Sequence, residues 1–86
     1  AQDPESLLIS ASRALKLERY EAAAEMFDEL YRKNPRDARI LMGRAVALQK
    51  TGRPEAALST YEDLLRIDPD NTEALVNMMG LLRGQY

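Results

Sequence analysis

The chain has 86 residues, enough for one domain whose core is only just self-sufficient in an ordinary globular fold. It contains no cysteine and no histidine, which excludes disulfides, thiolate nucleophiles, imidazole bases and the usual zinc ligands. Its 12 basic and 14 acidic residues are spread along the whole length and give a net charge of −2, whereas nucleic-acid binding normally needs a concentrated basic surface.

The apolar pattern excludes two further classes of protein. No apolar stretch is long enough to cross a bilayer, and the first residues, Ala1-Gln2-Asp3-Pro4, do not form a signal peptide. We therefore expect a soluble protein without a cofactor, a bound metal, a nucleic-acid partner or a membrane partner. A cytoplasmic location is favoured and a periplasmic one stays open, because a protein without cysteine suits either compartment. The chain lacks an initiator methionine, which is consistent with a piece of a longer protein.

The first two predicted helices form a pair. Asp3 provides a capping side chain, Pro4 fits the first helical position because its missing N–H is not needed there, and Glu5 adds an acidic first turn. Apolar residues then recur at helical spacing: Leu7, Leu8, Ala11, Ala14 and Leu15. A second helix begins near Tyr20 and ends at Asn34-Pro35, because proline lacks a donor and disfavours helical geometry in the preceding residue.

The next two predicted helices repeat this plan. Asp37 can cap a third helix, and Gly52 supplies a left-handed residue that ends it. Pro54 opens a fourth helix, which closes at Asp68-Pro69. The connections are only a few residues long, so neighbouring helices must lie antiparallel.

A fifth predicted helix follows Asn71. Its apolar residues Leu75, Met78, Met79 and Leu82 stand at helical spacing, and we expect this face to pack on the preceding pair. Val76 and Leu81 would then point elsewhere.

The helix pairs belong to an internal repeat of 34 residues. When residues 4–37 are laid over residues 38–71, 10 positions are identical, whereas composition alone gives roughly two or three matches. We expect a single domain over residues 1–86, with one repeat at 4–37, a second at 38–71 and a partial third at 72–86. Because one pair cannot bury both of its faces, each pair must be covered by the next.

The recurring residue types resemble the tetratricopeptide repeat. The resemblance is carried by a small residue in each first helix, a second alanine, an aromatic residue and a closing proline: Ala11/Ala45, Ala23/Ala57, Phe27/Tyr61 and Pro35/Pro69. Two positions depart from the pattern, because Glu18 stands at the turn glycine of the first unit and Met79 stands where a small residue is expected. Gly84-Gln85-Tyr86 resembles the family's turn between helices, arriving two residues early, so the resemblance implies that the last helix ends there. The resemblance implies an all-α stack of antiparallel helix pairs, an α-solenoid of about five helices.

Members of this family bind peptides or protein segments in a concave groove lined by the first helix of each repeat. The resemblance therefore implies a protein partner, and it assigns these groove residues: Leu8, Ser12, Arg39, Met42, Val46, Gln49, Val76 and Asn77. Glu5, Ile9 and Gly43 belong to the same surface. An apolar middle suits an amphipathic helix or an extended apolar segment. The alternative is that these side chains only pack between adjacent helices.

One class of ligand is disfavoured. Repeats that hold the acidic tails of heat-shock chaperones use lysine, asparagine and arginine side chains, and the matching positions here are Leu8, Ser12, Gly43, Glu73 and Asn77. No cationic clamp remains, and Glu73 would repel a carboxylate. We therefore expect no binding of an acidic chaperone tail.

Three functions stay open at this level. The first is an adaptor or scaffolding module that binds another protein. The second is a structural unit that forms a homodimer through the last helix, where Val76 and Leu81 are the candidate contacts because a terminal helix should present a polar outer face. The third is a fragment of an enzyme that carries such repeats.

No catalytic residue is predicted, and we expect no enzymatic activity. The acidic pairs Asp28-Glu29 and Glu62-Asp63 are adjacent in sequence, and adjacent helical residues point apart, which indicates solvated surface charge. The charge balance also disfavours a helix-turn-helix DNA-binding domain.

Overall fold

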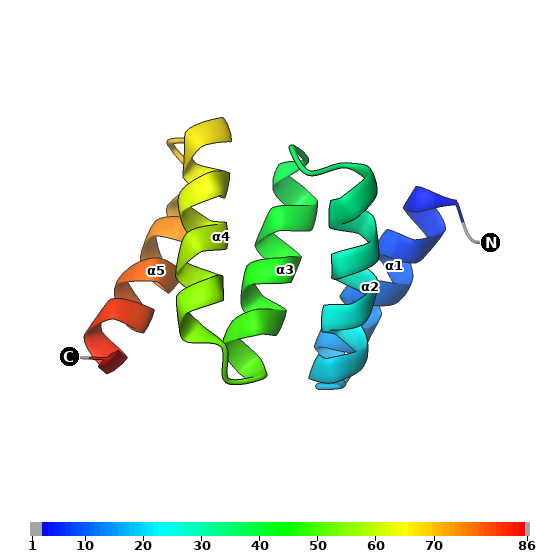
Figure 1. Ribbon diagram of the computed structural model, residues 1–86, viewed down its shortest axis with the longest axis horizontal. Coiled ribbons are helices and arrows are strands. Elements are labelled where there is room, and N and C mark those ends of the chain that lie inside the picture. The colour runs from blue at the N-terminus through cyan, green and yellow to red at the C-terminus, as the bar shows by residue number, and fades with distance from the viewer. Residues whose placement is uncertain (1–2, 86) are drawn as a thin grey trace.

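The computed structural model describes residues 3–85. Within them the chain forms five α-helices and no strand, which confirms the predicted all-α repeat stack. Their bounds are α1 Pro4–Lys16, α2 Tyr20–Lys33, α3 Ala38–Lys50, α4 Pro54–Ile67 and α5 Thr72–Gln85. The helices follow one another along an elongated body of 41 × 25 × 18 Å, with α1 and α5 at opposite ends of its long axis (Figure 1).

A polar side chain caps the first helix of each unit, α1, α3 and α5, as the sequence predicts for α1 and α3. Asp3 Oδ1 accepts a hydrogen bond from the Ser6 N–H at 2.9 Å, and Asp37 Oδ1 accepts one from the Arg39 N–H at 2.9 Å. In α5 the cap is an amide, because Asn71 Oδ1 accepts from the Ala74 N–H at 3.0 Å. Each bond satisfies one backbone donor that has no partner within the helix.

The two turns inside the helix pairs use the same backbone geometry with different residues. Gly52 has φ 78° after α3, as its predicted left-handed role requires. Glu18 has φ 60° after α1, so the first unit holds a residue with a side chain in the conformation that glycine adopts more readily.

The core consists of two clusters, one for each complete unit. The first joins α1 and α2 with one face of α3, and its largest fully buried side chains are Phe27 and Leu30. The second joins the other face of α3 with α4 and α5 around Tyr61 and Leu64. Small residues stand where helices cross closely: Ala11, Ala23, Ala45 and Ala57 are all fully buried. Helix α3 therefore contributes to both clusters.

The predicted orientation of α5 is wrong. Leu81, which we expected on an outer face, is 9% exposed and packs in the second cluster with Ala74, while Met78 lies half-buried beside them. Leu75, Met79 and Leu82, which we expected to face inwards, are 42%, 54% and 40% exposed. Both sets have helical spacing, so periodicity alone could not choose between the two faces. Two residues lie as expected: Val76 is 59% exposed, and Met78 packs against the second cluster.

The end of α5 also differs from the prediction. The helix continues through Gly84 to Gln85, so the expected turn at Gly84-Gln85 does not form within the described residues. Tyr86, the third residue of that predicted turn, lies outside them. Gly84 has no positive φ, unlike Gly52.

Candidate binding groove

The predicted groove residues lie at equivalent places on α1, α3 and α5. Leu8, Met42 and Val76 are each 34 residues apart, so they occupy the same position in the first helix of successive units. Leu8 and Met42 are half-buried, and Val76 is 59% exposed. Apolar side chains therefore reach solvent at the same register along the three first helices.

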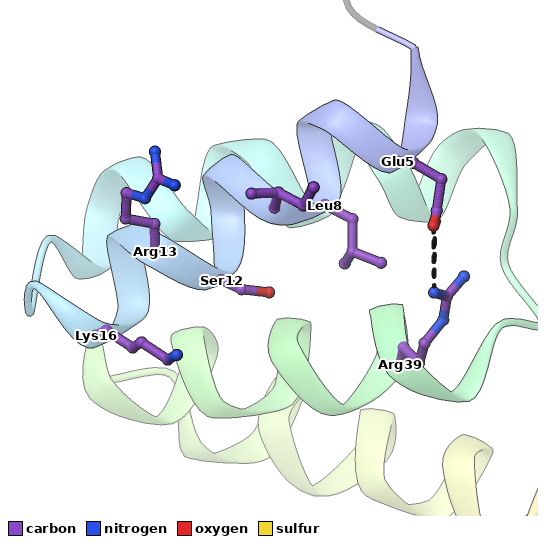
Figure 2. A pocket seen from close by; sticks show the side chains of 7 residues that line it. Glu5, Leu8, Ser12, Arg13, Lys16 and Arg39 are labelled. Carbon is purple, nitrogen blue, oxygen red and sulfur yellow. Dashed lines mark hydrogen bonds and ion pairs between the residues drawn. The ribbon is translucent and has the colours of Figure 1, made fainter.

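A pocket of about 370 Å³ opens between α1 and the start of α3. Its lining comes from six residues of α1 and one of α3: Glu5, Leu8, Ile9, Ser12, Arg13, Lys16 and Arg39. Lys16 and Arg39 lie at opposite ends of the pocket, with Ser12 between them (Figure 2). Ile9 is 59% exposed, a large apolar side chain that packing within the chain leaves uncovered.

An ion-pair network closes one end of this pocket. Arg39 Nη1 lies 3.4 Å from Glu5 Oε2 (Figure 2). Arg39 Nη2 lies 3.0 Å from Asp37 Oδ2. The hydrogen bond from Arg39 holds the pKa of the Asp37 carboxyl below its ordinary value of 3.8. This network joins the N-terminal ends of α1 and α3.

The other end of the pocket is positively charged. Among the described side chains, neither Arg13 nor Lys16 has an ion-pair partner. Two uncompensated cations beside Leu8 and Ile9 create a site that is apolar at its centre and basic at its rim.

Beyond the pocket, the surface continues along α3 towards α5. Met42, Val46 and Gln49 are all half-buried. The Tyr61 hydroxyl donates to Gln49 Oε1 at 3.5 Å. Burial raises the pKa of Tyr61, and a hydrogen bond with Asn77 opposes this rise. Tyr61 therefore holds one predicted groove residue, Gln49, from beneath the surface.

The middle of the surface is shaped by a contact between a glycine and an aromatic ring. A Cβ atom on Gly43 would overlap the buried ring of Phe27, so α3 can lie against that ring only without a side chain at this position. In the next unit the equivalent residues are Asn77 and Tyr61, where the aromatic residue carries a hydroxyl and the facing residue carries an amide. The contact between a first helix and the preceding aromatic residue is thus apolar at Gly43 and Phe27, and polar at Asn77 and Tyr61.

The structure brings Leu8, Ser12 and Arg39 together in the pocket. The other predicted groove residues lie outside this pocket, on α3 and α5: Met42, Val46, Gln49, Val76 and Asn77. Two further pocket residues, Arg13 and Lys16, were not predicted from the sequence. Lys16 could have been found, because it follows Ser12 by four residues and so lies on the same face of α1.

The described residues hold no group of three or more acidic side chains that could bind a metal ion. No helix in residues 3–85 is long and apolar enough to cross a membrane. Every buried side-chain nitrogen or oxygen in this part of the chain has a hydrogen-bond partner.

Comparison with known proteins agrees with this architecture. The family model described as "Tetratricopeptide repeat" matches residues 10–72. The chain belongs to the tetratricopeptide repeat family. Over 39 residues it is 44% identical to the TPR repeat-containing protein PA4667 of Pseudomonas aeruginosa, a match that covers 45% of this chain and 7% of that protein. Repeats of this family generally mediate protein–protein interaction without catalysis.

Proposed function

We propose that this chain is a non-catalytic interaction module that binds a helix or an extended segment of a partner protein in the groove on α1, α3 and α5. The pocket between α1 and α3 carries the proposal. Its apolar residue Ile9 stays 59% exposed although two helices, α2 and α3, pack against α1. Side chains that served only to pack adjacent helices would be buried.

The chemistry of the groove indicates the kind of segment it would bind. Leu8 and Ile9 offer an apolar contact at one end, and Met42 and Val46 continue it along α3. Methionine adapts to irregular ligand surfaces because its side chain is unbranched. Arg13 and Lys16 favour an acidic side chain next to the apolar residues of the ligand. An amphipathic segment with neighbouring apolar and acidic residues meets these requirements.

An acidic chaperone tail remains an unfavourable ligand. Such a tail requires polar or cationic side chains along the floor of the groove, where this chain has Leu8, Ser12 and Gly43. Its cations lie at the rim, and Glu73 on α5 adds a negative charge. The same charge pattern supports no nucleic-acid partner.

The test is a selection of peptides from a displayed library against the 86-residue chain. Val46→Glu and Met42→Glu place a charge in the groove, and Leu17→Glu makes a similar change at a 56% exposed residue that is not among the predicted groove residues. Selected peptides should lose more than about tenfold in affinity for both groove variants, since burying an uncompensated charge costs at least that much. They should bind the Leu17→Glu chain unchanged. Peptides that bind all four chains equally would refute the groove assignment.

A second function is favoured by one observation on the last helix. Leu75, Val76, Met79 and Leu82 are 40–59% exposed, and together they form an uncovered apolar surface on α5. We propose self-association through this surface as the second function. The mass of the chain in solution, measured over a dilution series, tests it. Leu81, named with Val76 in the sequence-based hypothesis, is too buried to contribute directly.

A further inference from the structure

The exposed face of α5 has a defined counterpart in the complete second unit. Residues of α5 stand 34 positions after their equivalents in α3. Ile40 and Ala47 of α3 pack against the preceding unit, and their equivalents Ala74 and Leu81 are buried in the same way. Another three residues of α3 pack against α4: Leu41, Ala45 and Leu48. Their equivalents are the exposed Leu75, Met79 and Leu82, so this face corresponds to one that a second helix covers in a complete unit.

These exposed residues form a regular stripe. Leu75 and Met79 are four residues apart, and Met79 and Leu82 are three apart, while Thr72 stands three residues before Leu75. Alternating spacings of three and four give the narrow seam along which two helices pair in a coiled coil. We call these four residues, Thr72, Leu75, Met79 and Leu82, the α5 seam.

Met79 distinguishes this seam from its equivalents. At the same position α1 and α3 have Ala11 and Ala45, both fully buried, which permit close approach of α2 and α4. A methionine there would hold a second helix of that kind further away. It suits a helix at wider separation whose side chains interlock with the seam, such as a second α5 seam.

Charge selects the orientation of such a pair. Glu73 lies in the first turn of α5 and Arg83 in its last turn. An antiparallel pair brings Glu73 of each copy towards Arg83 of the other and aligns the helix dipoles favourably, whereas a parallel pair sets like charges side by side. Pairing Leu75 with Met79 of the second copy also sets Thr72 opposite Leu82, which uses the seam over nearly the whole helix.

We infer that two copies of this chain dock through their α5 seams as an antiparallel helix pair related by a two-fold axis. The inference rests on the second function proposed above and assigns its geometry. The seam and the neighbouring Val76 expose only a few hundred Å² per copy, below the roughly 800 Å² per partner of a standard interface. The dimer is therefore weak, and it forms at high micromolar concentration.

Sedimentation equilibrium of the 86-residue chain tests the self-pairing. Between about 10 µM and about 1 mM, the range in which weak interfaces populate, the average mass should rise from 9.7 kDa towards twice that value. Met79→Glu should abolish the rise, because it places two charges in the seam. Leu17→Glu, an equal change at an exposed leucine on the first unit, should leave it intact. A monomer at the highest concentration overturns the inference together with the second function.

A separate experiment tests whether a second helix of the repeat, and not a second copy of the chain, covers the α5 seam. A synthetic peptide with the sequence Tyr20–Lys33 reproduces a second helix of this repeat. If the chain stays monomeric yet binds this peptide in a manner that Met79→Glu abolishes, the face belongs to a repeat-type helix and the inference is overturned.

A zero-length cross-link tests the orientation. In an Arg83→Lys chain, carbodiimide activates the Glu73 carboxylate, the amine introduced by the substitution attacks it, and an amide forms with release of the urea. Within one helix these two positions are ten residues apart, about 15 Å, so the link must join two copies. Peptide mass spectrometry should detect the link in the dimer of the Arg83→Lys chain and not after Met79→Glu is added. A dimer that lacks this link would refute the antiparallel geometry and leave self-association itself standing.

Discussion

Helices α3 and α5 occupy equivalent positions in successive units, yet they are stabilised very differently. Helix α3 packs on α2 with one face and on α4 with the other, and six of its 13 residues are buried. Helix α5 packs on α4 with one face and buries Ala74 and Leu81. A first helix in such a stack thus has two separate tasks: one face attaches it to the preceding unit, and the other builds its own unit.

This difference explains why identical residues at equivalent repeat positions can differ in burial. Leu41 and Leu75 are the same residue at the same repeat position, but Leu41 is fully buried and Leu75 is 42% exposed. The hydrophobic stabilisation of a side chain scales with the apolar area removed from water, so equivalent leucines contribute unequally. Matched substitutions in the two helices measure this inequality directly.

The largest expected effect separates these two leucines. Leu41→Ala should lower the free energy of unfolding by about 2–5 kcal/mol, because it removes a fully buried side chain and leaves a cavity. Leu75→Ala should lower it by less than about 1 kcal/mol. Urea unfolding at low protein concentration, where α5 is unpaired, provides the measurement. Equal losses for the two variants would mean that α5 is as fully packed as α3.

Two helical glycines sharpen the same comparison. Gly43→Ala should destabilise the chain by about 1–3 kcal/mol, since the added methyl group overlaps the buried Phe27 ring. Gly80→Ala in α5 meets open space and should stabilise it by about 0.5–1 kcal/mol through helix propensity. Thermal unfolding followed by circular dichroism can measure both. A loss of stability from Gly80→Ala would contradict the open surroundings of α5.

Arg44 of α3 should show a smaller difference in stability between the two helices. Arg44 Nη1 donates to Thr60 Oγ1 at 2.8 Å, Arg44 Nε donates to Asp28 Oδ1 at 3.0 Å, and the guanidinium lies 4.3 Å from the Tyr31 ring centre. The equivalent residue of α5 is Met78. Arg44→Met should cost about 1–2 kcal/mol, because it removes charge-assisted hydrogen bonds that tie α3 to both neighbouring helices.

The control for this variant is Arg66→Met, which removes an exposed ion pair with Asp63. Its effect should stay below about 0.5 kcal/mol. If both variants had the same small effect in urea unfolding, the contacts of Arg44 would be no stronger than those of a surface arginine.

The helices and the repeat could be predicted from the sequence, because each depends on local signals. Pro35 and Pro69 marked the ends of α2 and α4, and Gly52 marked the end of α3. The 34-residue period identified the repeated units. Three of the predicted groove residues share one pocket for the same reason, since repeat position fixes their place on the first helices. Partner binding by those residues remains a prediction.

The orientation of α5 could not be predicted from periodicity. Apolar residues occupy two adjacent faces of this helix, one with Ala74 and Leu81 and the other with Leu75 and Leu82. In a complete unit both faces are buried, so both carry apolar residues. Which one is covered depends on whether a second helix lies against it, and that is a tertiary contact. The pocket residue Arg13 was missed for a related reason, because neighbouring α3 completes that pocket.

The smallest expected effect concerns the caps. Asp37 begins α3 with a carboxylate whose pKa is lowered by hydrogen bonds from Arg39, whereas Asn71 begins α5 with an amide that does not titrate. Because the pKa of Asp37 is lower in the folded than in the unfolded chain, its stabilisation is fully present above the ordinary value of 3.8. It is lost as the pH falls through the folded pKa. Asp37→Ala should therefore cost about 1 kcal/mol at neutral pH and much less in acid.

Asp37→Asn separates capping from titration. It keeps an acceptor for the Arg39 N–H, so α3 would begin as α5 does, with an amide cap. Unfolding free energies measured between neutral pH and pH about 2.5 should fall less steeply for this variant than for the native chain, because one titrating carboxylate is gone. Asn71→Asp should have the opposite effect and give α5 an acid-sensitive cap. If neither substitution changes the slope, the two helix starts are equivalent in acid, and the difference between α3 and α5 lies entirely in apolar packing.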